Sequence, residues 1–521
     1  MKVKKRCDTP IIDYAEKLTS SYIETSDSLK RKIKGQFFTP KQVALFMSAL
    51  FNIKKKKIRL LDPGAGTGIL SCAFCERLSK FKSSRTLEID AYESDANLVD
   101  FLEETLAFCK NEVEKRGHKL EYKIHKEDFV LHNARYLNQN LLFDRDLKFY
   151  DFVISNPPYF KLNKDSKQSR IMEDLVSGQP NIYTFFMALS VAMLKDNGEL
   201  VFITPRSFCS GLYYKRFREW FFDKSHISNI HIFESRKDVF DKDKVLQENI
   251  ILKAKRAIDN TRAGLKIRIS KSKDKSFTNL EWIDLQYNDI VHSKNGDVII
   301  RIPTSNRDNR ILHLIDSMPN TLHSLGLEIS TGPVVHFRAK EHLLPEFKEK
   351  GKEAPLLWMH NIKDMDVIWP HQKNNKELAI KISKKTRPLL VPVKNYVLVK
   401  RFSSKEQKRR LYAGILLASE IKHELIGLEN HLNYIHRPFG ELSEDEAYGI
   451  AAFLNSSITD NFFRAMNGNT QVNATDVRKL PLPSKEGICM IGSRVRSEKP
   501  EIGPELDSMI SSILNIKSET L

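Results

Sequence analysis

The chain has 521 residues, of which 41% are hydrophobic, so it can form two to four globular domains and is not disordered throughout. Lys and Arg outnumber Asp and Glu by 84 to 66, and the net charge of +18 favours a polyanionic partner, most simply nucleic acid, over a merely solvated basic surface. Six cysteines make no disulfide framework, and neither a signal peptide nor a run of 18 apolar residues is found, so we expect a cytoplasmic protein without a membrane span.

The first half of the chain alternates strand and helix patterns. The predicted strands are residues 59–61, 88–92, 149–155, 199–204, 227–235 and 249–253, and the helices between them include residues 96–109 and 182–194. This alternation predicts an α/β fold with a doubly wound, mostly parallel sheet. Cys72 and Cys75 form a C-x-x-C pair without a second pair to complete a zinc site, so we interpret them as core residues of a helix and predict no metal site.

The pattern changes near residue 260, where we place a boundary between domains 1–260 and 261–521. The strand-like runs beyond it are short and mixed, which predicts a mixed α/β second domain. Its strongest helix follows a capping box of Ser443 and Glu446.

A glycine-rich turn, DPGAGTG at residues 62–68, follows the first strand and precedes a helix. It lacks the G-K-[ST] of a phosphate loop, and Ile69 stands where a dinucleotide fingerprint has its third glycine. The spacing suits a ligand without a pyrophosphate, such as S-adenosylmethionine, whose cationic amino group Asp62 could contact directly or through water. Glu93, at the end of the second strand, is placed to accept the ribose hydroxyls. Asp128 follows a third strand and suits the adenine amino group, unless it is a surface carboxylate.

The stretch DFVISNPPYF, residues 151–160, ends a buried strand on an amide, two prolines and a tyrosine. Sheets of this type bind ligands at the carboxyl ends of their strands, so this tip should face the same crevice as the glycine turn. An exocyclic amine on an aromatic ring is a poor nucleophile, and two acceptors aimed at its hydrogens would free its lone pair. The Asn156 side-chain oxygen and the Pro157 carbonyl are such acceptors, while an exposed Tyr159 offers a flat face for a base.

NPPY after DPGAGTG, with GQFFTP at residues 35–40 ahead of both, resembles the γ-class of S-adenosylmethionine-dependent DNA adenine-N6 methyltransferases over roughly residues 30–255. Residues 454–483 resemble the tail of restriction-modification methyltransferases. The resemblance implies a seven-stranded Rossmann-like sheet followed by a DNA target-recognition domain. It also implies the modification enzyme of a type II restriction-modification system, which acts as a monomer on double-stranded DNA at the bacterial nucleoid, with a separate cognate restriction endonuclease encoded alongside.

The family's functional residues carry over to matching positions. The resemblance assigns catalysis to Asn156, Pro157 and Tyr159, and base stacking to Tyr159 and Phe240, the latter being alternatively a core residue. The implied cofactor contacts are Gln36, Phe37, Thr39, Pro40, Asp62, Gly64, Gly66, Glu93, Asp128, Phe129 and Pro158.

An adenine must leave the duplex to reach such a pocket, so a second surface has to grip phosphates and read neighbouring bases. The second half supplies cations at Lys400, Arg401, Lys405, Lys408, Arg409 and Arg410, and amides at Asn469, Gln471 and Asn473. A solvated basic face is the alternative for the cations. The target sequence cannot be read from these residues, because their side-chain directions are unknown.

Other functions stay open at this point. NPPY also occurs in methyltransferases of RNA bases and of protein glutamine, and the fold could belong to a catalytically decayed DNA-binding specificity protein. Cytosine-N4 enzymes favour serine in place of Asn156, and the chain has no Pro-Cys pair for cytosine-C5 chemistry. A lone E-x-K within residues 419–424 is weak evidence for a fused nuclease.

Overall fold

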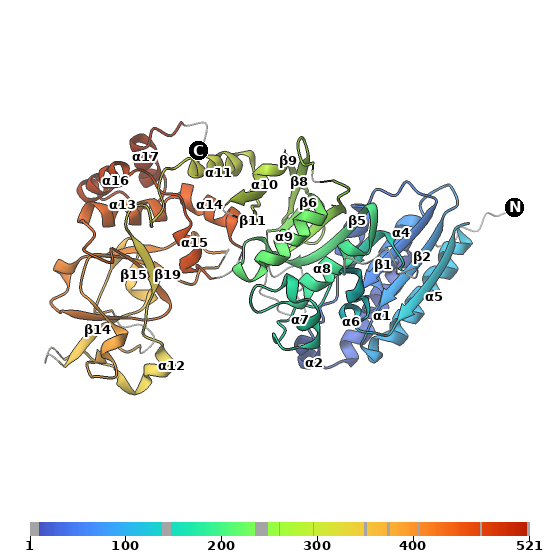
Figure 1. Ribbon diagram of the computed structural model, residues 1–521, viewed down its shortest axis with the longest axis horizontal. Coiled ribbons are helices and arrows are strands. Elements are labelled where there is room, and N and C mark those ends of the chain that lie inside the picture. The colour runs from blue at the N-terminus through green and yellow to red at the C-terminus, as the bar shows by residue number, and fades with distance from the viewer. Residues whose placement is uncertain are drawn as a thin grey trace. The chain divides into compact units, whose positions relative to one another are not determined.

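The computed structural model describes residues 10–137, 147–234, 248–259, 261–294, 296–348, 352–371, 376–404, 406–468 and 471–517. The chain divides into two compact units, unit 1 (Met1–Thr304) and unit 2 (Ser305–Leu521) (Figure 1). In the described ranges, no helix is long and apolar enough to cross a membrane.

Unit 1 is built around one nine-stranded sheet with the order β3-β2-β1-β4-β5-β7-β6-β8-β9. The pairs among β3, β2, β1, β4 and β5 are parallel, whereas β7 is antiparallel to both of its neighbours. The strands are β1 (Lys57–Pro63), β2 (Thr86–Tyr92), β3 (Lys119–His125), β4 (Tyr150–Ser155), β5 (Leu194–Pro205), β6 (Ser225–Phe233), β7 (Asn249–Arg256), β8 (Lys266–Ser272) and β9 (Glu281–Gln286). The predicted α/β fold with a mostly parallel sheet is confirmed.

The structure divides the chain after Thr304 and not near residue 260, and it adds β8 and β9 to the seven strands that were predicted. Strand β8 pairs in parallel with β6, and β9 pairs antiparallel with β8, so both extend the sheet beyond residue 260. Ile267, Ile269 and Leu285 on these strands join the core of unit 1. The hairpin β10 (Val291–Lys294) and β11 (Asp297–Ile300) follows before the units divide after Thr304.

Helices cover both faces of the sheet and form two cores (Figure 1). Adjacent residues of a strand point to opposite faces, so Leu60 and Ile154 belong to one core and Leu61 and Val153 to the other. Every residue of β4 is buried, as expected of a central strand covered on both sides. The helices of unit 1 are α1 (Ile11–Thr25), α2 (Ser28–Ile33), α3 (Lys41–Ala49), α4 (Ile69–Leu78), α5 (Ala96–Lys115), α6 (Phe129–Asn133), α7 (Lys167–Ile171), α8 (Ile182–Ala192), α9 (Lys215–Lys224) and α10 (Tyr287–Ile290).

Cys72 and Cys75 are fully buried on α4, as predicted. They lie in the core that α1, α3, α4 and α5 form against the sheet, together with Cys109 of α5. They therefore serve the packing of this layer.

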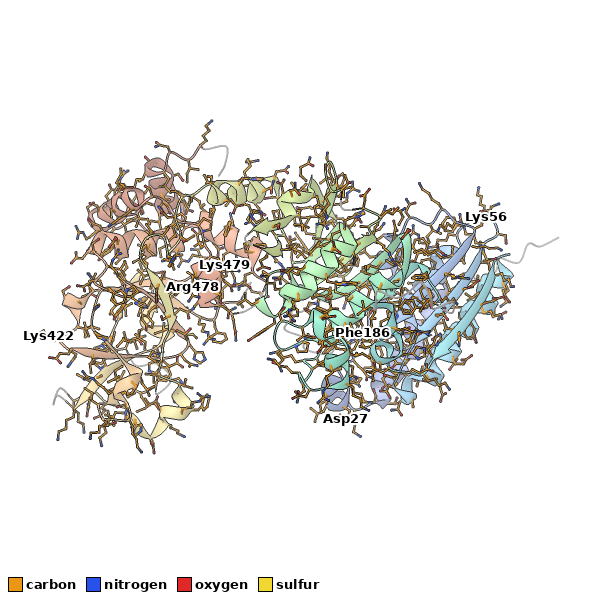
Figure 2. The ribbon with its side chains drawn as sticks, viewed as in Figure 1. Asp27, Lys56, Phe186, Lys422, Arg478 and Lys479 are labelled. Carbon is orange, nitrogen blue, oxygen red and sulfur yellow. The ribbon has the colours of Figure 1, made fainter. Side chains whose placement is uncertain are left out.

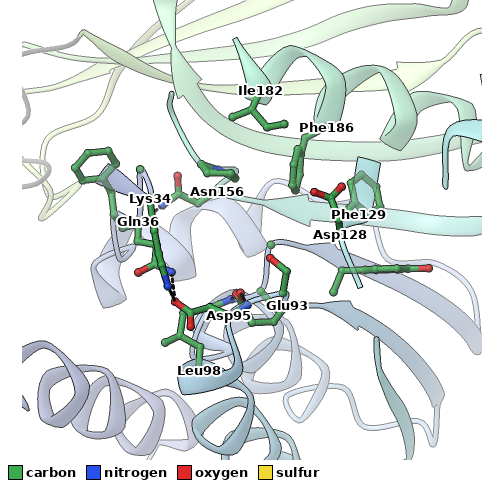
Figure 3. A pocket seen from close by; sticks show the side chains of 18 of the residues that line it. Lys34, Gln36, Glu93, Asp95, Leu98, Asp128, Phe129, Asn156, Ile182 and Phe186 are labelled. Carbon is green, nitrogen blue, oxygen red and sulfur yellow. Dashed lines mark hydrogen bonds and ion pairs between the residues drawn. The ribbon is translucent and has the colours of Figure 1, made fainter. Parts of the chain in front are cut away.

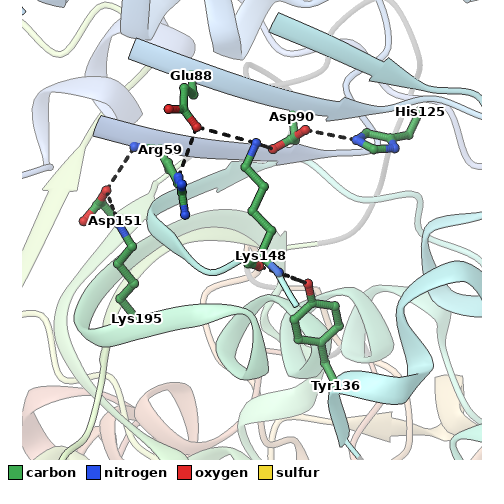
Figure 4. Close-up of polar contacts among 8 residues, drawn as sticks. All are labelled: Arg59, Glu88, Asp90, His125, Tyr136, Lys148, Asp151 and Lys195. Atoms are coloured by element: carbon green, nitrogen blue, oxygen red, sulfur yellow. Dashed lines mark hydrogen bonds and ion pairs between the residues drawn. The ribbon is translucent and has the colours of Figure 1, made fainter. Parts of the chain in front are cut away.

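A polar network fixes the start of β4 (Figure 4). The buried Asp151 carboxylate accepts hydrogen bonds from Lys55 Nζ at 2.6 Å, Lys195 Nζ at 2.9 Å and the Arg59 backbone N–H at 3.0 Å. Burial opposes ionisation of Asp151, but the two lysines hold its pKa below the usual value. These bonds tie β4 to its surroundings in the sheet, so the tip of β4 projects from a rigid base.

Unit 2 contains two sheets, with strand orders β12-β22-β19-β20-β16-β15 and β13-β17-β14-β21-β18. The strands are β12 (Glu328–Thr331), β13 (Leu343–Leu344), β14 (Glu353–Leu357), β15 (Ile362–Lys363), β16 (Asp366–Val367), β17 (Ala379–Lys381), β18 (Leu390–Pro392), β19 (Tyr396–Lys400), β20 (Ala413–Leu416), β21 (Leu425–Leu428) and β22 (Leu432–His436). The helices are α11 (Asn306–Asp316), α12 (His336–Ala339), α13 (Glu444–Asn455), α14 (Ser457–Met466), α15 (Ala474–Arg478), α16 (Lys485–Glu498) and α17 (Pro504–Ile513).

The mixed α/β character predicted for the second half is confirmed, as is the capping box of α13. The Ser443 hydroxyl accepts from the Glu446 N–H at 3.1 Å, and the Ser443 N–H donates to the Glu446 carboxylate at 2.9 Å. Many exposed cations cover the surfaces of the two units, among them Lys56, Lys422 and Lys479 (Figure 2).

Candidate active site

A cavity of about 410 Å³ lies at the carboxyl ends of β1, β2 and β4 (Figure 3). The three sequence motifs meet there, although more than a hundred residues separate the first from the last. The predicted cofactor residues that line the cavity are Gln36, Phe37, Thr39, Gly64, Gly66, Glu93, Asp128, Phe129 and Pro158, and Asn156 lines it with them.

The glycine turn binds the carboxylate of Glu93. Gly66 has a φ of +58°, and its N–H donates to Glu93 Oε2 at 2.9 Å, while the Asp95 N–H donates to Oε1 at 2.8 Å. At Gly68, a Cβ would lie 2.9 Å from Leu102 Cδ1, so glycine allows α4 to pack against α5. Burial raises the pKa of Glu93, with the two N–H bonds opposing that rise. Glu93 thus stands on the cavity wall with free lone pairs for a pair of hydroxyl groups.

Asp62 lies behind the glycine turn and is not on the cavity wall. It is fully buried, its Oδ2 accepts from the Ser71 hydroxyl at 2.6 Å, and its Oδ1 lacks a hydrogen-bond partner among the described residues. Two roles were predicted for Asp62, direct contact with a ligand's amino group and contact through water. Its buried position does not support the direct contact. A contact through water agrees better with it, and the Ser71 bond also anchors α4.

Asp62 should make stability depend on pH. Burial raises the pKa of Asp62 to about 7, although the Ser71 hydrogen bonds lower it. An unfolded aspartate has a pKa of about 3.9, so the folded protein retains a proton that the unfolded chain releases between about pH 4 and 7, and stability falls as pH rises through that window. The Asp62→Asn variant has no group to titrate at this position. The difference in unfolding free energy between variant and wild type, measured by urea unfolding, should therefore shift by about 2 kcal/mol in favour of the variant from pH 5 to pH 7.5. A pH-independent difference would contradict the raised pKa.

Two aromatic rings and the carboxylate of Asp128 lie at the far end of the cavity. The rings of Phe129 and Phe186 lie 4.9 Å apart between centroids, beside Asp128 (Figure 3). Asp128 caps α6 by accepting from the Leu131 N–H at 2.9 Å, and it accepts from Gln168 Nε2 at 2.9 Å. Flat apolar walls with an acceptor beside them suit a purine that carries an amino group.

The GQFFTP segment forms one wall of the cavity. Asp95 accepts from Lys34 Nζ at 2.7 Å and from Gln36 Nε2 at 2.8 Å, and the Tyr159 N–H donates to the Gly35 carbonyl at 3.4 Å. These bonds hold the segment between the glycine turn and NPPY. Pro40 precedes α3 as its N-cap and, unlike Thr39, does not line the cavity, and its contact with the cofactor stays a prediction.

The Asn156 side chain has one defined orientation. Its Nδ2 donates to the Phe37 carbonyl at 2.6 Å and to Thr39 Oγ1 at 3.0 Å, and its Oδ1 accepts from the Tyr159 hydroxyl at 2.5 Å. A backbone carbonyl can only accept, so Nδ2 must face Phe37 and Oδ1 must point the other way. Oδ1 retains a second lone pair, and Asn156 lines the cavity.

Tyr159 differs from the prediction of an exposed aromatic. It is 7% exposed and does not line the cavity, because its ring stacks on Phe37 at 5.8 Å and meets Tyr183 edge-on at 6.2 Å. Its hydroxyl contacts Asn156 Oδ1 and the Ile203 carbonyl, the latter at 2.8 Å. Burial raises the pKa of this hydroxyl well above its usual value, so it remains a donor. In this structure Tyr159 orients the Asn156 amide and offers no free face to a base.

The remaining predicted residues have separate outcomes. Pro157 is buried beside Asn156, and in the described part of the chain no backbone hydrogen bond to its carbonyl is found. That carbonyl therefore has capacity to accept. Phe240 lies outside the described residues, and its base-stacking role stays a prediction.

Comparisons with known proteins decide the family. The model of the Eco57I restriction-modification methylase matches residues 70–240. The type II methyltransferase M.BsuBI of Bacillus subtilis is 36% identical over 506 residues, which cover 96% of this chain and 98% of that relative. The chain belongs to the type II methyltransferases of restriction-modification systems. The type II methyltransferase M.PstI of Providencia stuartii is 32% identical over 491 residues, 94% of each chain.

Among solved structures, the type ISP restriction-modification enzyme LlaBIII bound to DNA is 12% identical and matches with a TM-score of 0.47. The match covers 93% of this chain and 41% of LlaBIII.

Several cavity residues of this methyltransferase were not predicted from sequence. Lys34 and Asp95 form an ion pair beside the GQFFTP segment, and Gln168 donates to Asp128. Phe160 and Phe186 add aromatic rings to the cavity wall. Phe160 directly follows NPPY and could have been found from that position. The others belong to no motif, and only the fold brings them to the cavity.

The predicted DNA-binding cations of the methyltransferase are of two kinds. Lys408 is exposed, and Lys400 and Arg409 lie over the Tyr412 ring at 5.0 and 5.2 Å. Arg401 is half-buried and donates to the Asn430 carbonyl at 3.0 Å. Lys405 lies outside the described residues.

The prediction for Arg410 is wrong. Arg410 is 1% exposed, and its guanidinium donates to Ser403 Oγ and to the Asn467 carbonyl, each at 3.1 Å. Arg410 therefore connects the segments of Ser403 and Asn467 inside unit 2. Its place beside Arg409 in a basic run gave no sign of this burial.

The predicted amides also differ from one another. Gln471 is exposed, and its backbone pairs with that of Phe402. Asn473 Nδ2 donates to Asp476 Oδ2 at 3.2 Å at the start of α15, which indicates a structural role. Asn469 lies outside the described residues.

Proposed function

We propose that this methyltransferase transfers the methyl group of S-adenosylmethionine to N6 of an adenine that has been flipped out of double-stranded DNA. The observation that carries the proposal is the fixed amide of Asn156 at the tip of β4, where Asn156 lines the cavity. Asparagine at this position favours adenine over cytosine N4, for which serine is typical.

The proposed chemistry is positioning and electrostatic preorganisation. Asn156 Oδ1 and the Pro157 carbonyl each accept a hydrogen bond from the adenine amino group. These two bonds draw the nitrogen toward a tetrahedral geometry and free its lone pair. S-adenosylmethionine supplies an electrophilic methyl group next to that lone pair. The Tyr159 hydroxyl and the Phe37 carbonyl keep the amide from rotating when the base arrives.

The cavity has the polar groups that the cofactor requires. Glu93 would accept the ribose hydroxyls, and Asp128 the adenine amino group, between the apolar walls of Phe129 and Phe186. Gly64, Gly66 and the GQFFTP segment would enclose the methionine part, and Asp62 would act on its amino group through water.

A transfer assay with several acceptors tests this proposal. The purified protein is incubated with radiolabelled S-adenosylmethionine and duplex DNA from a methylation-free host, total RNA or a glutamine-containing protein extract. We expect label in DNA alone, and nucleoside chromatography should recover it as N6-methyladenine. Label in N4-methylcytosine, RNA or protein would contradict the proposed acceptor, and cofactor binding without any transfer would indicate a catalytically decayed protein.

We propose that unit 2 recognises the DNA target, and that a separate restriction endonuclease cuts the same site when it is unmodified. Exposed cations and aromatic rings on one domain suit phosphate contacts. The exposed Lys408 and the half-buried Lys400 over the Tyr412 ring support such a surface in unit 2.

Lys400→Ala with Lys408→Ala should weaken the salt dependence of DNA binding. Each lost phosphate contact lowers the slope of log K against log salt by about 0.9, so the double variant should lose about 1 to 2. Fluorescence anisotropy at several salt concentrations measures the slope. Lys56→Ala is a matched control, because Lys56 is exposed just before β1 at the edge of the sheet opposite the cavity. A slope equal to that of the control would place the DNA surface elsewhere.

A further inference from the structure

Two large apolar side chains face solvent on the catalytic edge of unit 1. After β5 ends at Pro205, the chain forms two short turns, η4 (Arg206–Cys209) and η5 (Leu212–Tyr214), before α9. Leu212 and Tyr213, the exposed pair, are 49% and 59% exposed. Strand β5 runs parallel to β4 with Phe202 opposite Ser155, so both strands end at the same edge of the sheet. The exposed pair therefore lies on the edge that presents Asn156.

The turn that carries the exposed pair is held in place. The Tyr213 ring lies against Gly178, where a Cβ would come within 2.2 Å of Tyr213 Cδ1. The Arg216 N–H donates to Ser177 Oγ at 2.9 Å, and the Gly211 N–H donates to the Ser207 carbonyl at 3.1 Å. Apolar side chains on an anchored turn present a fixed shape to a partner.

Ring contacts connect this turn to the catalytic motif. The ring of Tyr214, next to Tyr213, lies 5.9 Å from that of Tyr183, which lies 6.2 Å from that of Tyr159. The Tyr183 hydroxyl also contacts Ser207 Oγ at 3.0 Å. Ring contacts from Tyr214 through Tyr183 to Tyr159 thus connect the exposed pair with the residue that orients Asn156.

The surroundings of the exposed pair carry several cations, and also the exposed acids Glu173 and Asp174 on η3 (Glu173–Leu175), which contacts α9. Residues 160–170, which follow NPPY, contain four cations and one aspartate, and residues 206–218 contain four cations and no acidic residue. Arg206 and Arg218 are buried in ion pairs with Glu248 and Asp297, whereas Lys164, Lys167 and Arg216 are exposed. The apolar tip suits a base stack, and exposed cations such as Arg216, close to it in sequence, suit the phosphates beside that stack.

We propose that Leu212 and Tyr213 insert into the base stack of double-stranded DNA, at the place that the target adenine leaves when it moves to Asn156. The inference rests on the proposed function and adds the residues that keep the duplex open. Flipping unstacks the adenine from its neighbours, and apolar side chains that replace it compensate for the lost stacking. The partner of the exposed pair is therefore the duplex at the target base pair.

The test compares two duplexes that differ only opposite the target adenine. One has thymine there, and the other has an abasic residue, which weakens the hold on the adenine. The oligonucleotide sequence is taken from the site that the wild-type enzyme modifies in cellular DNA. Leu212→Ala with Tyr213→Ala forms the variant. Ile258→Ala is the control, because Ile258 is 68% exposed beyond β7, which runs antiparallel to β5 and ends at the opposite edge.

For the paired duplex, kcat/KM of the variant should fall about 10- to 100-fold, while the abasic duplex should restore it to within about threefold of wild type. The affinity for S-adenosylmethionine should remain that of wild type, and both duplexes are assayed below the melting temperature of the variant, which loses the contact of Tyr213 with Gly178. An equal loss on both duplexes would overturn the inference by showing general DNA contact, and no loss on either would overturn it as well. If the wild-type enzyme itself fails to methylate adenine in the paired duplex, it is the proposed function that fails.

Discussion

Asn156→Ala should lower methyl transfer by at least about a hundredfold and leave the affinity for S-adenosylmethionine within about threefold of wild type. The alanine cannot accept a hydrogen from the adenine amino group, and preorganised groups of this kind contribute about 10²- to 10³-fold to a rate. The cofactor keeps Glu93, Asp128 and the aromatic walls of its cavity. Single-turnover kinetics measure transfer, and calorimetry measures cofactor binding.

Two further variants sharpen this prediction. Asn156→Asp retains an acceptor but loses the donor to the Phe37 carbonyl, so its rate should lie between those of alanine and wild type. Asn163→Ala, an exposed asparagine a few residues beyond NPPY, should transfer methyl groups normally. If Asn156→Ala turned over at the wild-type rate, the proposed role of the amide would be wrong.

Substitutions of Tyr159 should separate its hydroxyl from its ring. Tyr159→Phe keeps the packing against Phe37 and Tyr183 but loses the hydrogen bond to Asn156 Oδ1, so we expect kcat to fall about tenfold with unchanged cofactor affinity. Tyr159→Ala also leaves a cavity in the core and should cost about 3 to 5 kcal/mol of unfolding free energy. Single-turnover rates and urea unfolding measure the two effects.

Because Tyr159 is buried, each of the two variants tests a different part of its proposed role. A wild-type rate for Tyr159→Phe would show that the hydroxyl does not position the amide. A stability loss below 1 kcal/mol for Tyr159→Ala would show that the ring leaves the core, as base stacking would require. Binding of the target base should weaken more than cofactor affinity in the alanine variant, because the Asn156 amide, which is proposed to bind the base, loses the hydroxyl that orients it.

The sequence allowed the sheet, the glycine turn and the catalytic tip to be predicted, because each has a local signal. Apolar runs of strand length revealed β1, β2 and β4, and the carboxyl-end rule placed their tips in one crevice. The boundary was misplaced because β8 and β9 have mixed patterns, yet their alternate residues complete the core.

Burial of polar residues was the information that the sequence lacked. Arg410 reads as one more cation in a basic run, although Ser403 and the Asn467 carbonyl bind it inside unit 2. Tyr159 was expected to be exposed at a strand tip, but the GQFFTP segment, over a hundred residues earlier, supplies the Phe37 ring that covers it. Such contacts depend on which segments meet, and no spacing rule encodes them.

Methylome sequencing of DNA from a methylation-free bacterial host that expresses this chain tests the central claim most directly. We expect N6-methyladenine at one recurring short sequence, and its disappearance when Asn156→Ala replaces the wild type. Modified cytosine at a recurring sequence, or unmodified DNA in cells that contain the folded wild-type protein, would contradict the assignment of adenine N6 as the acceptor.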